Sequence, residues 1–307
     1  MLNQRFPVKE KFPNCPDKLT ARQLERCRED GYIAFEGLLS GAEVEEARRA
    51  ISELVLRVLN LARAGSPEVV VKSPRGLGHS FSGTFINLVN DTFGLQFEEG
   101  VDPTEMEPAE AELRIRKLMY YHRQHPVFGR MVEHSKIRGI IDCVLSPGAT
   151  LFQDMALIKP SFIGVEKPWH QDNAYFKYAP LEEIMGVWIA LDDATPENGC
   201  MYVIPGAHRQ GPRRHFHGTD CEIVHDRIDQ SQAVPIELKA GGVLFFFGMM
   251  PHRTPPNTSP QRRRAVQFHY RSIRTVELPE PDYNRLFAEA DGSPASCRAA
   301  KNSLDYT

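Results

Sequence analysis

The sequence predicts a mainly β protein with helices in its N-terminal part. Apolar residues recur at helical spacing in much of the first 140 residues, whereas residues 149–275 consist of short apolar runs separated by turn residues. Several short strands with turns between them favour a sandwich or barrel over βαβ units, in which helices would alternate with strands. Because neither an internal repeat nor a linker is visible, we predict a single domain over residues 1–307.

The N-terminal part should begin with an extended arm and continue as helical support. Residues 1–18 contain three prolines and no periodic pattern, which indicates the arm. Thr20 can cap a first helix that Gly31 ends, and Ser40 can cap a longer second helix whose apolar residues recur every three or four positions. Residues 19–148 are therefore predicted to be helical support that includes a lid loop.

The expected lid covers residues 65–104, a segment rich in Gly, Ser, Pro and Phe without a sustained period. Long irregular segments often serve binding, so this segment is either a substrate wall or a surface loop with some packing of its own. A helical pattern returns over residues 108–140. By itself it makes Lys117 a solvated helix residue.

Short strands are predicted in the second half at 151–158, 186–191, 200–204, 242–247 and 264–270. A polar insert at 207–235 interrupts the series, and residues 276–307 form a polar tail that should wrap the surface.

Composition excludes several classes of function. The net charge is −3, whereas a general nucleic-acid binder needs a clear surplus of Lys and Arg. No apolar run reaches the ~18 residues of a membrane span, and the first residues lack a secretory signal. The six cysteines are scattered, which favours reduced thiols. We therefore expect a cytoplasmic protein with no nucleic-acid or membrane partner.

A group of metal-ligand residue types stands in the strand-rich half. His170 and Asp172 would point to the same side of an extended chain, and a third imidazole would complete the three-ligand set of a non-haem Fe(II) site. His252 follows a buried strand and is the candidate for that imidazole. Arg263 begins the last strand and shares a face with Gln267 and His269, among others, which suits a wet cavity that binds a carboxylate through two contacts.

These residues and their spacing resemble the phytanoyl-CoA dioxygenase family of Fe(II)/2-oxoglutarate oxygenases. The similarity includes Trp188, eighteen residues after His170, and the segment from Glu197 to His208, and it extends from about Asp30 to Arg271. It implies a double-stranded β-helix core (jelly-roll, cupin-like) at 149–275, flanked by α-helices. The family's usual Gly-Asp before the fourth strand is Gly-Gly here, which affects a turn and no ligand.

The resemblance also assigns roles. It makes His170, Asp172 and His252 the iron ligands and Arg263 the partner of the distal carboxylate of 2-oxoglutarate. Positions that line the co-substrate pocket in the relatives are occupied here by Lys117, Met155 and Trp188, although Trp188 could equally be a core residue. Gln153 is added because it shares the strand face of Met155.

The implied reaction couples oxidative decarboxylation of 2-oxoglutarate to succinate and CO2 with hydroxylation of an unactivated C–H bond. The expected cofactors are Fe(II), 2-oxoglutarate and O2, with ascorbate as a candidate reductant. Asp172 disfavours the related halogenases, which need a small residue at that position so that chloride can bind. Two alternatives are a cupin-like metalloprotein without 2-oxoglutarate turnover and a non-catalytic jelly-roll binding module.

The substrate is predicted only as a small molecule, whether an acyl-CoA, a free acid or a natural product, and the protein as a monomer or homodimer. An acyl-CoA would need basic residues at the cleft mouth. Candidates are Arg209, Arg213, Arg214, Lys72 and Arg75, for which a solvated rim is the preferred interpretation. Phe81, Phe85 and the 207–235 insert are hypothesised to shape the substrate pocket.

Overall fold

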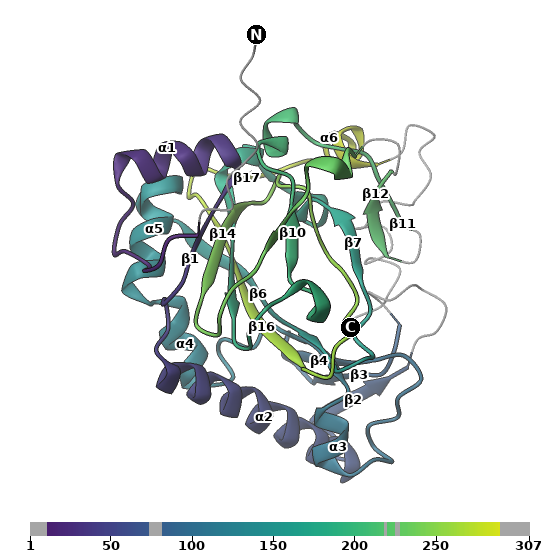
Figure 1. The fold of residues 1–307 in the computed structure, drawn as a ribbon. Coiled ribbons are helices and arrows are strands. Elements are labelled where there is room, and N and C mark those ends of the chain that lie inside the picture. Colours follow the sequence, from purple (N-terminus) through teal and green to yellow (C-terminus); the bar gives the residue numbers. More distant parts are fainter. Residues whose placement is uncertain (1–10, 74–81, 218–219, 225–227, 289–307) are drawn as a thin grey trace.

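A computed structural model describes residues 11–73, 82–217, 220–224 and 228–288 of the chain. Two antiparallel sheets form the centre of the molecule, and helices of the N-terminal half lie outside the larger sheet (Figure 1). The predicted fold class, a mainly β jelly-roll with N-terminal helices, is confirmed.

The larger sheet has nine strands, and the two chain halves share it. Its strands, in spatial order, are β1 (Tyr32–Phe35), β14 (Val243–Phe247), β9 (Ile184–Ala190), β16 (Arg263–Arg271), β6 (Thr150–Lys159), β5 (Ile115–Met119), β4 (Gly94–Phe97), β3 (Phe85–Leu88) and β2 (Val69–Lys72). Each adjacent pair is antiparallel.

The smaller sheet has four strands, in the order β13 (Val234–Ile236), β10 (Met201–Val203), β15 (His252–Thr254) and β7 (Lys167–His170). Two short ribbons complete the β structure: β11 (His215–His217) with β12 (Cys221–Ile223), and β17 (Val276–Glu277) with β8 (Tyr178–Ala179).

The helices are α1 (Ala21–Asp30), α2 (Gly41–Arg63), α3 (Pro108–Glu112), α4 (Pro126–Val132), α5 (Ser135–Leu145) and α6 (Glu280–Phe287). Thr20 and Ser40 cap α1 and α2 as predicted, each within a reciprocal capping box. Gly31 ends α1 with a φ of +83°, a conformation that glycine adopts without strain.

Hydrophobic side chains form two layers, one on each face of the larger sheet. The outer layer joins that sheet to α2, α4 and α5, and the inner layer fills the space between the two sheets. Strand β16 contributes to both: Val266 and Phe268 face the helices, whereas Ala265 faces the smaller sheet. Burial of one Val, Leu, Ile or Phe side chain contributes about 1.5–3 kcal/mol, so the two layers fix the sheet order against slippage.

The prediction of irregular structure over residues 65–104 is wrong. The segment forms β2, β3 and β4, which extend the larger sheet. Every residue of β4 is buried, and the alternation of Leu95 and Phe97 with Gln96 extends over too few residues to stand out from the surrounding Gly- and Phe-rich segment.

The prediction of a helix around Lys117 is also wrong, because Lys117 lies in strand β5 between β4 and β6. Leu118 packs toward the helices in the outer layer. Lys117 and Met119 point to the opposite face, toward the smaller sheet.

The insert and the tail are more ordered than predicted. The insert contains β11 and β12, and the tail contains α6, whose Tyr283 and Phe287 are fully buried. Four cysteines are free thiols, but Cys221 is disulfide-bonded, so the expectation of reduced thiols does not hold for it. Among the described residues, no helix is both long and apolar enough to cross a bilayer.

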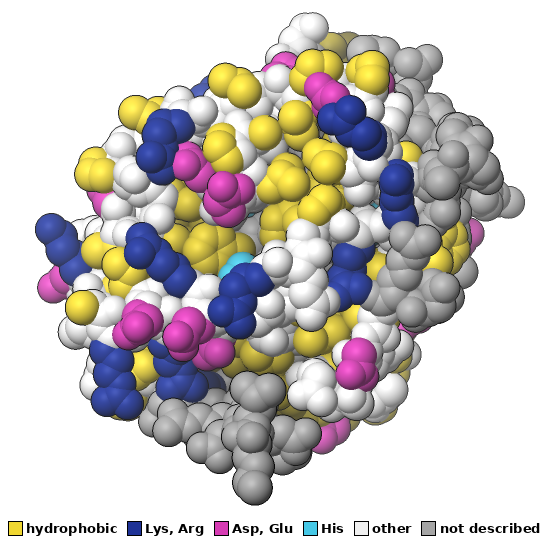
Figure 2. Space-filling view, turned by 90° about the horizontal axis from the view of Figure 1, so that it is seen from above, with side chains coloured by type: hydrophobic (Ala, Val, Ile, Leu, Met, Phe, Trp, Pro, Cys, Tyr) yellow, Lys and Arg dark blue, Asp and Glu magenta, His cyan; other side chains and the backbone are white. Residues whose placement is uncertain are grey.

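On the face shown in Figure 2, Lys and Arg side chains are interspersed with Asp and Glu around hydrophobic residues. The described part of this face therefore carries no extended patch of one charge.

Candidate active site

His170, Asp172 and His252 lie together between the two sheets. One potential ligand atom from each residue lies within 4.8 Å of the others, and all three residues are buried. Oδ1 of Asp172 is 3.5 Å from Nε2 of His170 and 3.6 Å from Nε2 of His252. Two imidazole nitrogens and one carboxylate oxygen therefore converge on a single point.

Strand pairing explains the convergence. Although 82 residues separate them in the chain, His170 of β7 and His252 of β15 are direct cross-strand neighbours. Strand β7 ends at His170, and Asp172 begins a short 3₁₀ helix (Asp172–Tyr175). Gln171 between them has extended backbone angles, which keeps the imidazole and the carboxylate on the same side.

Hydrogen bonds orient both imidazoles. Nδ1 of His170 lies 2.8 Å from the carbonyl oxygen of Pro168, and Nδ1 of His252 lies 2.9 Å from that of Met250. A carbonyl oxygen only accepts, so Nδ1 carries the proton in each ring and Nε2 presents a lone pair to a metal.

Burial and the surrounding charges favour the protonation states of His252 and Asp172 that can bind a metal. Burial, together with the nearby His170, lowers the pKa of His252 to about 3, so this ring is neutral at pH 7. Burial alone would raise the pKa of Asp172, but the imidazoles of His252 and His269 outweigh it and hold that pKa well below its usual value. The site therefore offers a neutral imidazole at His252 and an anionic carboxylate.

Hydrogen bonds of Gln171 connect the segment that contains His170 and Asp172 to the rest of the protein. Its side-chain amide donates to the carbonyl of Met249, near His252, and accepts from the backbone N–H of Arg213. Its own backbone N–H donates to Nε2 of His215, whose pKa burial lowers to about 3. The insert thus braces the metal-ligand segment from behind.

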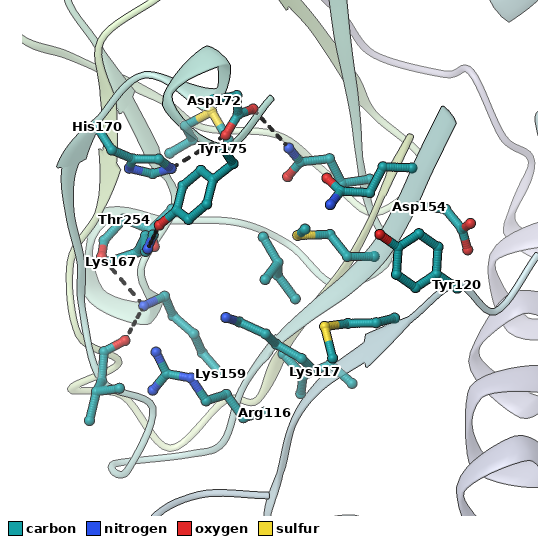
Figure 3. A pocket seen from close by; sticks show the side chains of 18 of the residues that line it. Arg116, Lys117, Tyr120, Asp154, Lys159, Lys167, His170, Asp172, Tyr175 and Thr254 are labelled. Carbon is teal, nitrogen blue, oxygen red and sulfur yellow. Dashed lines mark hydrogen bonds and ion pairs between the residues drawn. The ribbon is translucent and has the colours of Figure 1, made fainter. Parts of the chain in front are cut away.

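The ligands open onto a cavity of about 330 Å³. The three metal-ligand candidates and Arg263, Lys117, Gln153 and Met155 all line it. In Figure 3, Arg116, Lys117 and Lys159 point into one part of the cavity, while Tyr120 and Asp154 lie on the opposite side.

Strand register separates charged from uncharged side chains along the cavity wall. Arg263 pairs with Lys159 at one end, and Lys117 follows one row later, beside Leu157. The next rows on the same face contain Gln267, Met155 and Met119, followed by Gln153 and His269. The described wall is therefore cationic at one end and is lined by methionine and amide side chains beyond it.

Arg263 is the most deeply buried of these cations, with 1% of its surface exposed. Its Nη1 donates to the carbonyl of Leu157 at 3.0 Å, and its guanidinium lies 5.5 Å from the ring centroid of Trp188. Burial lowers the pKa of Arg263 to about 10, which leaves it charged at pH 7. Among the described residues, no carboxylate forms an ion pair with it.

Trp188 does not line the cavity. It is fully buried in the inner hydrophobic layer and contacts the guanidinium of Arg263 with its ring. This placement makes Trp188 a support for Arg263, in agreement with the core-packing interpretation.

Lys117 is half-buried, and within the described residues nothing pairs with its ammonium group. The pKa of Lys117 is lowered to about 7, mainly by burial and to a smaller extent by repulsion from Arg116 and Lys167. An anion entering this end of the cavity would restore the full charge.

The sequence did not single out Arg116, Lys159 or Lys167. Lys159 donates to the carbonyls of Val165 and Thr254, and Lys167 pairs with Asp220 at 2.6 Å. The strand pattern already placed His269 on the face of Arg263. Only the folded arrangement shows that it contacts Asp172.

Of the residues proposed for an acyl-CoA rim, the four that the structure describes do not border the cavity. Arg213 and Arg214 line a separate shallow surface pocket, and Arg214 donates to carbonyls at the end of α6. Lys72 lies in β2 away from the wall, Arg209 is also absent from it, and Arg75 falls outside the described residues.

The described residues do not support the hypothesis that Phe85 and the 207–235 insert shape the substrate pocket. None of the described residues of the 207–235 insert lines the cavity, and neither does the buried Phe85. Phe81 lies outside the described residues. The wall is instead completed by Asn87, Leu88, Asp91 and Thr92, at and after the end of β3, so part of the expected lid does form a wall.

Similarity to known proteins agrees with the metal site that this geometry indicates. The family model described as phytanoyl-CoA dioxygenase (PhyH) matches residues 27–265. The chain belongs to the phytanoyl-CoA dioxygenase family.

Two curated relatives cover nearly the whole protein. Phytanoyl-CoA dioxygenase domain-containing protein 1 of Danio rerio is 30% identical over 275 residues, which are 86% of this chain and 94% of the relative. Phytanoyl-CoA dioxygenase of Arabidopsis thaliana is 28% identical over 284 residues, or 86% of this chain and 97% of the relative.

Solved structures share the fold of this family member at lower identity. The non-heme alpha ketoglutarate dependent carbocyclase SnoK from nogalamycin biosynthesis superposes with a TM-score of 0.62 at 21% identity and 91% coverage of both chains. EctD from S. alaskensis, solved with 2-oxoglutarate and 5-hydroxyectoine, has a TM-score of 0.60 at 21% identity, covering 85% of this chain and 79% of EctD.

Proposed function

We propose that this protein is an Fe(II)- and 2-oxoglutarate-dependent dioxygenase that hydroxylates an unactivated C–H bond of a small organic substrate. The observation that carries the proposal is the convergence of two imidazole Nε2 atoms and one carboxylate oxygen beside a cavity with a cationic end. Family membership supports the oxygenase class, whereas the reaction type is our own inference.

The donor set suits Fe(II). Two imidazoles and one carboxylate would leave three positions of a six-coordinate ion open on one side. Bound iron together with 2-oxoglutarate supplies the O2 activation that couples decarboxylation to oxidation of the substrate. His170, Asp172 and His252 hold the metal, and their orientation is set by the hydrogen bonds of the two Nδ1 atoms.

The cationic end of the cavity suits 2-oxoglutarate, a dicarboxylate. Arg263 provides N–H groups without a competing carboxylate, and Lys117 adds a second positive charge on the neighbouring strand row. Trp188 supports the guanidinium from behind, and Met155 and Gln153 line the wall beyond it. A single pre-positioned arginine explains the choice of a dicarboxylate over a simple 2-oxo acid.

The organic substrate would then bind at the other end of the cavity, away from Arg263 and Lys117. Met119, Met155, Gln153 and Tyr120 lie there, with Phe176 across the cavity. Such a wall suits the apolar portion of a substrate with one or two hydrogen-bonding groups, and places its C–H bonds beside the metal. An intact Asp172 carboxylate favours hydroxylation over halogenation.

The test is a turnover assay for succinate release from 2-oxoglutarate, first without and then with a panel of small organic acids, acyl-CoA esters and natural products. We expect slow Fe(II)-dependent succinate formation that ceases when iron is chelated and increases with an accepted substrate. Absence of succinate under every condition, from protein that still binds Fe(II), would favour the cupin-like metalloprotein instead.

Binding of 2-oxoglutarate should weaken as the pH rises above about 7. Lys117 has a pKa of about 7, which is lowered by burial and by Arg116 and Lys167 and partly raised again by Asp220 and Glu98. Only its protonated form attracts the carboxylate, so the apparent Kd should rise with pH by less than about tenfold per unit, the limit for one linked proton, because Arg263 still binds the carboxylate when Lys117 is neutral.

Anaerobic titration of 2-oxoglutarate from pH 6.5 to 9 measures this dependence. The Lys117→Met variant should bind more weakly at pH 7 and lose most of the pH dependence, whereas Lys117→Arg should lose the dependence but keep the affinity. An unchanged pH profile in Lys117→Met would assign the titration to another group.

A further inference from the structure

The two oxygens of the Asp172 carboxylate have different surroundings. Oδ1 faces the two imidazole Nε2 atoms at 3.5 and 3.6 Å. Oδ2 points the other way, toward strand β16, where Nε2 of His269 lies at 2.8 Å and the side-chain amide of Gln267 donates at 3.2 Å. Only one oxygen is therefore presented to the metal position.

Gln267 and His269 are well suited to hold Oδ2. They are two residues apart on the inner face of β16, a strand paired on both sides by β6 and β9. They are buried, with 2% and 1% of their surfaces exposed, and the ring of His269 packs against Phe176. Their position is thus fixed independently of Asp172, which approaches from the smaller sheet.

The tautomer of His269 follows from its surroundings. Its Nδ1 is buried and has no hydrogen-bond partner among the described residues. A proton there would remain unpaired at a cost of about 1–3 kcal/mol, whereas a proton on Nε2 is accepted by the carboxylate. His269 therefore donates to Oδ2 as Gln267 does, although these two nitrogens lie only 2.8 Å apart.

We propose that Gln267 and His269 are positioning residues that restrict Asp172 to ligation through a single oxygen. A carboxylate can bind a metal ion through one or both oxygens. With Oδ2 held by two N–H donors, the three protein ligands would leave three positions of a six-coordinate ion open, enough for 2-oxoglutarate and O2. If Oδ2 also bound the metal, the position for O2 would be lost. This inference rests on the proposed function.

The test counts metal-bound water molecules, which does not depend on activity. The full-length protein is loaded with Mn(II) in place of Fe(II), and broadening of its EPR lines in 17O-enriched water gives the number of bound waters. The wild type should hold three waters, falling to one when 2-oxoglutarate is added. The Gln267→Leu/His269→Phe double variant, which keeps side-chain bulk but removes both donors, should hold two and then none.

Two further variants control for general damage to β16. His269→Gln retains an N–H donor beside Gln267 and should keep the wild-type water count. Phe268→Leu lies between the two residues but faces the helices, so it should leave the count unchanged. For the double variant we also expect a fall in succinate formation of about 10–100-fold, typical of losing partners that orient a ligand.

The outcomes separate this inference from the proposed function. Three waters in the double variant would overturn the role of Gln267 and His269 while leaving the metal site intact. If the wild type fails to bind either Mn(II) or Fe(II), the proposed function itself is wrong. Two waters in the double variant and three in His269→Gln would establish the positioning role.

Discussion

Replacement of His170 by alanine is expected to abolish succinate formation and to reduce Fe(II) affinity strongly. His170 supplies one of three converging ligand atoms, and its cross-strand partner His252 cannot replace it. Loss of one ligand breaks the three-ligand set, and water in its place cannot restore the fixed geometry. Anaerobic Fe(II) titration and the succinate assay measure the two effects separately.

A histidine with a purely structural role provides the control. His125 caps helix α4 through its Nδ1 and lies outside the cavity wall. His125→Ala should cost about 1 kcal/mol of stability, the usual value for a lost cap, and leave iron binding intact. Wild-type turnover in His170→Ala would rule out His170 as a ligand.

Replacement of Arg263 by methionine should weaken 2-oxoglutarate binding while leaving iron binding nearly unchanged. The guanidinium is buried and pairs with no described carboxylate, so its charge is available to the co-substrate. Truncating one partner of a buried charge pair typically costs about 2–5 kcal/mol, which corresponds to an increase in Kd from roughly 30-fold to several thousand-fold.

The adjacent arginine is a matched control. Arg264 lies on the opposite face of β16, where it binds Asp192 through two nitrogens. Arg264→Met should lower stability without changing the Kd for 2-oxoglutarate. Loss of iron binding in Arg263→Met, or an equal loss of 2-oxoglutarate affinity in both variants, would indicate a structural role for Arg263.

The sequence predicted the parts of the site that depend on local pattern. Alternation along β16 correctly placed Arg263, Gln267 and His269 on one face, because a paired strand keeps a two-residue period. The same pattern could not show that His269 meets Asp172. That contact joins the two sheets across 97 residues of chain.

The errors in the secondary structure predicted for β4 and β5 have a common physical cause. Helical periodicity was extended through Lys117 because β5 is short and flanked by α3 and α4, so three- and four-residue spacings continue across it. Strand β4 was missed because the alternation of Leu95 and Phe97 with Gln96 is too short to indicate a strand by itself. In each case, pairing with neighbouring strands of the larger sheet determined the structure more strongly than local sequence did.

The most direct test of the account is an anaerobic visible spectrum of the purified protein, recorded after Fe(II) and then 2-oxoglutarate are added. We predict a weak metal-to-ligand charge-transfer band that appears only with both additions and is missing from Arg263→Met at the same concentrations. If the intact protein binds Fe(II) but shows no such band at saturating 2-oxoglutarate, the assignment as a 2-oxoglutarate-dependent dioxygenase is contradicted.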